Sequence, residues 1–292
     1  MKDFFKYMTV SEEDQAWGLY LNVAGKSKIA PGANYPSPQH PNGYYFTWRN
    51  GRTLNEYQIN YITEGAGILE NERGKFMVKA GCLMIIRKGE WHRYHPIKNE
   101  GWVEHFVGFD GKFASHFLRE NQILHGQSVI QCGVSEHFID TYYKIFELAK
   151  NEEPGNQHIA AALIIKLLGH IVAWEKQRNF SGKPIEKVIQ QARFCMRENI
   201  ENEVNLEQLA QDNNVAYSYF RKMFKKYTGI SPHQYHLDLK MMRAKELILT
   251  SDKSIKEISY ELDFQSIHYF SRLFKKKMGQ NPSELRGTIM KK

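Results

Sequence analysis

Apolar and polar positions follow two different patterns along the chain. Up to about residue 130, short runs rich in aromatic and β-branched residues are separated by Gly-containing turns. Such runs predict strands, and we place them at 44–48, 57–62, 76–78, 83–86 and 103–107. Regular short strands between Gly-rich turns favour an all-β sandwich or small barrel, and no helical period competes with this pattern.

From residue 135 the period becomes helical, with helices predicted over 135–150 and 156–178. The second helix is apolar on most of its surface, so it must bury more than one face. One side can cover the sandwich. The other can meet the same helix of a second chain or pack within one subunit, and the pattern favours neither. The longest apolar run, 159–168, contains Lys166 and is too short to span a bilayer, so no membrane segment is predicted.

The C-terminal part contains an internal repeat with an offset of 50 residues. Segments 219–232 and 269–282 share Phe, Phe, Lys, Lys, Gly and Pro at matched positions. At 100° per residue the phenylalanines lie on one helix face and the basic residues on the opposite face. Gly229 and Gly279 stand where a helix would end in a left-handed residue.

A shorter apolar helix precedes each copy, around residues 206–210 and 255–259. A short helix, a tight turn and a longer helix with a basic outer face form a helix-turn-helix, whose second helix enters the DNA major groove. A single cationic helix would more often be an ordinary solvated face. Two matched copies favour DNA binding.

These residues carry a family resemblance. Residues 185–286 resemble the DNA-binding domain of the AraC family of bacterial transcription regulators, in which a long helix joins two helix-turn-helix units. The pattern of the joining helix is matched at Arg243, Ala244, Leu247 and Ile248, and the strongest signature is 266–276, SIHYFSRLFKK. The resemblance implies an all-α domain over 185–292 and a ligand-binding and dimerisation domain over 1–178, with a linker at 179–184.

We expect helices 217–227 and 266–277 to enter successive major-groove segments ~34 Å, or one helical turn, apart, because the helix around 236–249 separates them. The side chains opposite the phenylalanine rows are our candidates for base contacts: Ser218, Arg221, Lys222, His268, Ser271 and Arg272. The remaining lysines are expected to meet phosphates; these are Lys225, Lys226, Lys275, Lys276 and Lys277.

The charge distribution agrees with a polyanion partner. Residues 181–292 hold 20 Lys+Arg and 13 Asp+Glu, and residues 1–180 hold 20 and 19, so the net charge of +8 divides into +7 and +1. Cys82, Cys132 and Cys195 are odd in number and form no CxxC, which argues against a disulfide framework and a structural zinc. With no cleavable signal pattern at the N-terminus, we predict a cytoplasmic protein.

The segments 61–67, 79–83 and 89–94 are similar to the cupin-like sensory domain, a jelly-roll barrel, of sugar-responsive AraC relatives. Many cupins bind a metal through His and Glu. Here Gly81, Gly89 and His92 preserve part of the second cupin motif, but the HxH pair of the first motif has no counterpart. Because a catalytic metal usually takes three protein ligands, we predict no metal, no cofactor and no enzymatic activity. His92, His95 and His105 can cluster, but structural roles are favoured. A metal-dependent cupin enzyme with an accessory DNA module remains an alternative.

Strand alternation places Trp102, Glu104 and Phe106 on one face. Together with Arg49, His92 and Tyr94, that face would offer aromatic platforms and hydrogen-bonding groups suited to a sugar. By resemblance to arabinose-binding members, Arg49, Tyr94, Glu104 and Phe106 fall near pocket positions. The alternative is that Trp102 and Phe106 are simply core.

The combined hypothesis is a ligand-responsive regulator, an activator of carbohydrate-utilisation genes. Its partners would be double-stranded DNA, a small effector such as a sugar, a second copy of the chain and RNA polymerase. The rival hypothesis is a regulator of stress or virulence genes with a lipid-like or aromatic effector.

Overall fold

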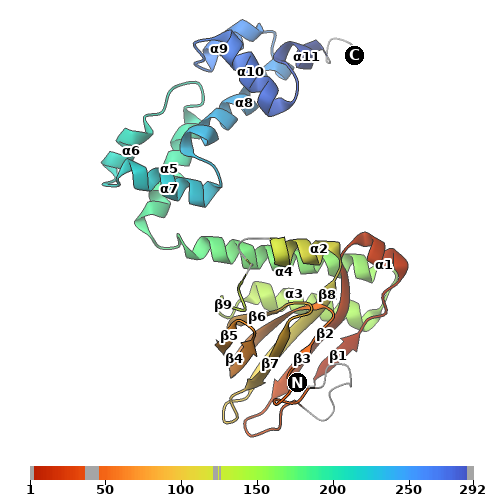
Figure 1. The fold of residues 1–292 in the computed structure, drawn as a ribbon. Helices are drawn as coiled ribbons and strands as arrows, with labels where there is room; N and C mark the ends of the chain where they lie inside the picture. Colours follow the sequence, from red (N-terminus) through yellow and green to blue (C-terminus); the bar gives the residue numbers. More distant parts are fainter. Residues whose placement is uncertain (1–2, 37–45, 121–123, 125, 288–292) are drawn as a thin grey trace. The chain divides into compact units, whose positions relative to one another are not determined.

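The computed structural model describes residues 3–36, 46–120, 124 and 126–287. The chain divides into two compact units, residues 1–175 and 176–292 (Figure 1). The division falls in the last turn of helix α4 (Asn156–Arg178), a few residues before the linker predicted at 179–184. The predicted fold class is confirmed, with a β-rich N-terminal domain and a helical C-terminal domain.

The first unit is built on one long strand, β4 (Tyr57–Asn71), that belongs to two layers of sheet. Its first part pairs with β8 and β6, and its last six residues pair with β5 and β7. Gly65, with φ of 76°, lies between the two parts, and the backbone of Gly101 is too close there for a side chain. Within the described residues the other strands are β1 (Phe4–Tyr7), β2 (Tyr20–Ile29), β3 (Arg52–Thr53), β5 (Gly74–Lys79), β6 (Cys82–Ile86), β7 (Trp91–Pro96), β8 (Trp102–Asp110) and β9 (Val129–Gln131).

Strand alternation sends side chains of the larger layer, β1-β2-β8-β4-β6-β9, to two different cores. One face packs against α3 (Glu136–Asn151) and α4, which lie across it in Figure 1. The opposite face points between the two layers, where Ile62, Met84 and Trp102 meet Leu69 and Tyr94 of the smaller layer. The interior of the barrel is therefore a separate core from the helix-covered face.

Several predictions for residues 1–130 need correction. Strand 44–48 is wrong where the structure describes it: Phe46–Asn50 forms a turn that a single bridge between Thr47 and Gly51 closes, while Tyr44 and Tyr45 lie outside the described residues. Strands β1, β2, β3, β7 and β9 were not predicted; β2 lacks a continuous β-branched run, and β3 and β9 have only two and three residues. Short helices are also present: α1 (Glu12–Trp17), α2 (Lys112–Ser115) and a π-helical turn, His116–Glu120. A capping box at Ser11 and Asp14 starts α1, which is too short to show a period.

Helix α4 is longer than the apolar run 159–168 from which we predicted that no segment spans a membrane. By length and composition it would be able to cross a bilayer. In this fold Ile164, Leu167 and Ile171 are instead fully buried against the sheet and α3, so α4 is a core helix of the first unit. Ile159 and Ile165, which lie outside this buried face, stay 52% and 43% exposed.

The second unit is all helical and has two cores. The first joins α5 (Pro184–Glu198), α6 (Leu206–Asp212) and α7 (Tyr217–Thr228), and the second joins α9 (Ile255–Glu261), α10 (Ile267–Met278) and α11 (Pro282–Gly287). Helix α8 (Pro232–Thr250) serves both, because Tyr235 and Leu239 pack in the first core while Met241, Ala244 and Leu247 pack in the second.

The repeat seen in the sequence is also a repeat of backbone conformation. Gly229 and Gly279 end α7 and α10 with φ of 89° and 81°, as predicted. In the turns before these helices, Asn214 and Asp263 adopt φ of 55° and 60°. Asn and Asp tolerate this left-handed region better than other side chains, which fits them to a tight turn between two helices.

Candidate nucleic-acid interface and ligand-binding interior

The second helix of each helix-turn-helix has a buried and an exposed face. Phe220, Phe224, Phe270 and Phe274 have no exposed surface, and they anchor α7 and α10 in the two cores. On the opposite face the six candidate base-contact residues are placed as follows: Ser218, Arg221, Lys222, His268 and Arg272 are exposed, and Ser271 is half-buried. The structure therefore leaves these polar groups free to meet a partner.

A tyrosine supports the candidate arginine in each unit. The Arg221 guanidinium lies 5.8 Å from the ring centre of Tyr217, and that of Arg272 lies 5.9 Å from Tyr269. The arginines are not equivalent in the repeat, because Arg221 aligns with Ser271 and Arg272 aligns with Lys222. The two surfaces therefore present different donors to DNA, and we expect them to recognise different base sequences.

The five candidate phosphate-contact lysines divide into two groups. All five are exposed, but two of them also contact a polar side chain of the protein. Lys226 donates to Asn179 Oδ1 at 3.0 Å, and Lys277 Nζ lies 2.7 Å from Asp238 Oδ1 on α8. The phosphate contact of Lys277 stays a prediction, and it would compete with this ion pair to α8.

In the first unit, Trp102, Glu104 and Phe106 point together into the barrel, while His105 points to α3 and packs against Phe146. Trp102 lies against Gly67, where any side chain would collide with the indole. Its ring centre is 5.9 Å from Tyr35 and 6.0 Å from Tyr94. The face predicted by alternation is thus an aromatic wall with one carboxyl group in it.

A chain of hydrogen bonds crosses this interior. Asn60 Nδ2 donates to Glu104 Oε1 at 2.6 Å and to the Tyr94 hydroxyl at 3.3 Å. Arg52 donates to the same hydroxyl at 2.6 Å and to His92 Nε2 at 3.2 Å. Every residue of this chain except Arg52 is buried.

Arg52 holds the position that the sequence analysis gave to Arg49. Arg49 is exposed in the turn 47–51, whereas the guanidinium of Arg52 lies 4.9 Å from the Phe46 ring centre and 5.3 Å from that of Tyr94. The interpretation of 44–48 as a strand caused the error, because it did not anticipate that turn. Asn60 was also missed, although alternation along 58, 60 and 62 places it on the interior face.

The interior shifts the protonation of its groups. Burial raises the pKa of Glu104 to about 7, and the hydrogen bond from Asn60 and the charge of Arg52 only partly offset this. Burial also raises the pKa of Tyr94 to about 12. It lowers the pKa of His92 to about 4, with Arg52 contributing, so His92 is neutral and accepts from Arg52.

Two polar atoms in this interior have no hydrogen-bond partner among the described residues: Trp102 Nε1 and Asn60 Oδ1. A buried donor and a buried acceptor without partners each cost free energy unless something else supplies the bond. A ligand hydroxyl can both accept from an indole N–H and donate to an amide oxygen. The site is therefore equipped for a hydroxyl-bearing molecule between aromatic rings.

Glu104 gives a test of this electrostatic account. Because its pKa is raised in the folded state, folded protein holds more protons than unfolded protein between about pH 4.5 and 7. Glu104 should therefore reduce stability as pH rises through that window. As pH rises from about 4.5 to 7, the free energy of unfolding of wild type should fall relative to that of Glu104→Gln. Urea denaturation of both proteins at several pH values measures this difference. A pH-independent difference between the two proteins would contradict a buried, titrating Glu104.

His92, His95 and His105 occupy three different environments. His92 lies inside the barrel, His95 packs against Trp48 with ring centres 4.2 Å apart, and His105 faces α3. The cluster that the sequence left open does not form, and the described residues contain no group of three potential metal ligands.

Comparison with known proteins agrees with both halves of this architecture. A family model described as an AraC-like ligand binding domain matches residues 34–168, and one described as a helix-turn-helix domain matches residues 209–288. The chain belongs to the AraC family of transcriptional regulators. As an AraC-family regulator it binds DNA through its C-terminal domain and a small-molecule effector through its N-terminal domain.

Three relatives align along most of the AraC-family regulator. The Msm operon regulatory protein of Streptococcus mutans is 24% identical over 260 residues, covering 88% of this chain and 92% of its own. The lactose operon transcription activator of Staphylococcus xylosus is 24% identical and covers 78% and 82%. The arabinose operon regulatory protein of Escherichia coli is 24% identical and covers 86% and 87%.

Proposed function

We propose that this AraC-family regulator activates carbohydrate-utilisation genes in response to a sugar bound inside the N-terminal barrel. The observation that carries the proposal is the row of hydrogen-bonded side chains Arg52, Tyr94, Asn60 and Glu104, of which all but Arg52 are buried, set among aromatic rings with an unpartnered donor and acceptor beside it. Rings that stack on C–H faces and polar groups that pair with hydroxyls are what sugar binding requires. Relatives named for lactose and arabinose operons add support.

The effector is identified by a thermal-shift screen of the full-length protein against sugars, fatty acids and aromatic acids. We expect a sugar to stabilise wild type, because binding to the folded state alone raises the melting temperature. Replacing Arg52 by Met or Glu104 by Gln should reduce affinity for that sugar about tenfold, since each removes a charge-assisted hydrogen bond in a buried site. Arg49→Met is the matched control and should bind like wild type.

A second effector class has its own observation in its favour. Phe106 and Phe5 lie 5.8 Å apart between ring centres, and together with Tyr35 and Trp102 they give the interior much apolar surface. A lipid-like or aromatic effector, in a regulator of stress or virulence genes, would use that surface. Stabilisation by a fatty or aromatic acid, with no sugar active, would replace the sugar proposal by this one.

We also propose that the regulator is a homodimer through α4. Ile159 and Ile165 are exposed on a helix that also has a fully buried face, and burying these two apolar side chains against a second copy is favourable. Sedimentation of the full-length protein should show a dimer, and Ile165→Lys should shift it toward monomer. A monomeric wild type at micromolar concentration would rule this out.

For the activator role, RNA polymerase is the implied partner and the cytoplasm the implied location, since the DNA target lies there. Deleting the gene of the regulator should lower expression from the promoter of the regulated genes in the presence of the effector. A reporter that rises on deletion would make the protein a repressor instead.

A further inference from the structure

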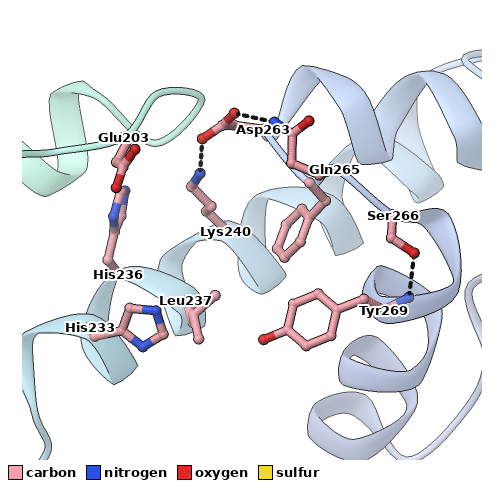
Figure 2. Close-up of a pocket in the computed structure, with 10 residues that line it drawn as sticks. Glu203, His233, His236, Leu237, Lys240, Asp263, Gln265, Ser266 and Tyr269 are labelled. Atoms are coloured by element: carbon pink, nitrogen blue, oxygen red, sulfur yellow. Dashed lines mark hydrogen bonds and ion pairs between the residues drawn. The ribbon is translucent and has the colours of Figure 1, made fainter.

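A cavity of about 520 Å³ opens between α8 and the turn that leads into α10 (Figure 2). Its walls come from three places in the second unit: Glu203 before α6, His233, His236, Leu237 and Lys240 on α8, and the segment 263–269 of the second helix-turn-helix. It thus borders both helix-turn-helix units and the helix that joins them. No role assigned so far uses it.

The cavity adjoins the recognition surface of α10. Tyr269 extends from α10 into the cavity, toward Leu237 and His233 in Figure 2. The same ring lies 5.9 Å from the Arg272 guanidinium. Ser266, which caps α10 through its bond from the Tyr269 N–H at 3.3 Å, also lines the wall. The cavity and the exposed face of α10 therefore share Tyr269.

Lys240 is the main charged group at the base. Its side chain is 8% exposed, and its ammonium lies 3.5 Å from Asp263 Oδ2, whose side chain is 40% exposed. A charge-assisted bond is usually about 2.7–2.9 Å long, so this contact is a long one, and an ammonium has three donors, which leaves Lys240 able to donate to a further group. Nearby, His236 Nε2 is buried without a partner among the described residues.

These groups match one ligand chemistry. Phosphates on DNA are bound by lysines, by hydroxyls such as those of Ser and Tyr, and by the N-termini of helices. The cavity offers Lys240, Ser266, Tyr269 and the N-terminus of the twelve-residue helix α10. Two carboxylates oppose an anion: Asp263, which Lys240 offsets, and Glu203, which is exposed at the rim.

We infer that this cavity receives a phosphate group of the DNA backbone that lies between the two major-groove segments. The inference rests on the proposed double contact with DNA and adds a third one to it. Lys240 and the α10 N-terminus bind the phosphate, and Glu203 limits how tightly it is held. The joining helix α8 then takes part in DNA binding directly, besides separating the two units.

The test uses full-length protein and its selected operator. Lys240→Met should lower affinity about three- to tenfold, equally on operator variants, and reduce the slope of log K against log salt by about 1. Glu203→Gln should raise affinity about two- to threefold. Lys245→Met, at an exposed lysine of the same helix, is the matched control and should change affinity less. Thermal melting checks that Lys240→Met is folded, and the exposed variant Glu203→Gln tests the cavity without touching a buried group.

A neutral methylphosphonate placed at each central position of the operator then locates the contact. At one position the methylphosphonate should lower the affinity of wild type for the operator and should not lower that of Lys240→Met any further. If the loss of affinity from the methylphosphonate and the loss from Lys240→Met add at every position, the inference is overturned, while two-segment binding by wild type is unaffected. A different result would be that inorganic phosphate stabilises wild type and not Lys240→Met, while no methylphosphonate position distinguishes the two proteins. That result would overturn the assignment of the cavity to a DNA phosphate. Failure of wild type to select any operator would instead reject the proposed function.

Discussion

Phe274→Ala should lower the free energy of unfolding of the second helix-turn-helix by about 3–5 kcal/mol. Its contact with DNA should be lost, while the contact made by the first helix-turn-helix survives. Phe274 has no exposed surface and packs in the core formed by α8 to α11. That core shares no residue with the one around α5, α6 and α7. Because each unit has its own core, loss of one should leave the other folded.

The measurement is a urea titration of the full-length protein combined with footprinting on its operator. Phe224→Ala is the matched variant in the first unit and should remove the other half of the footprint. Met242→Ala, at a side chain that is 61% exposed, should change neither the stability nor the footprint. If Phe274→Ala erased the whole footprint and unfolded both units together, the two cores would not be independent.

Arg272→Ala is expected to lose about 1–3 kcal/mol of binding on the preferred operator and to lose discrimination at one base position. An exposed guanidinium can bind O6 and N7 of a guanine with two hydrogen bonds, and this one lies 5.9 Å from the ring centre of Tyr269. Arg221→Ala should have the same effect at a position in the other segment. Lys276→Ala should weaken all operators alike, because a phosphate contact carries no sequence information.

Binding of each variant to a set of single-base operator substitutions separates these outcomes. A uniform loss for Arg272→Ala would reassign that residue to the DNA backbone. Equal effects of Arg221→Ala and Arg272→Ala at the same base position would mean that the two helices do not occupy separate segments.

The helical half of the molecule was largely predictable from its sequence. In α7 and α10 a wide apolar face, a Gly at the end and a following Pro all indicate the same structure, so propensity, period and capping agreed. The prediction of 156–178 also matches α4, but there it rests on a long stretch that is apolar on most of its surface. What the pattern did not show was pairing between helices, such as Lys277 with Asp238, because that depends on how α10 is rotated against α8.

The interior of the barrel was predicted less well. Alternation placed Trp102, Glu104 and Phe106 correctly, since one strand fixes their common face. Choosing Arg52 over Arg49 required the turn at 47–51, which the sequence presented as part of a strand. Hydrogen bonds such as Asn60 to Glu104 join strands that are 44 residues apart in the chain, and their register comes only from the fold.

Protection of guanine N7 from methylation tests the central claim most directly, because N7 lies in the major groove. With an operator selected from random DNA by the full-length protein, two protected segments should lie on one face of the duplex. Their centres should be about one helical turn, or ~10 base pairs, apart. Protection of a single segment, or of two segments on opposite faces of the duplex, would contradict the account.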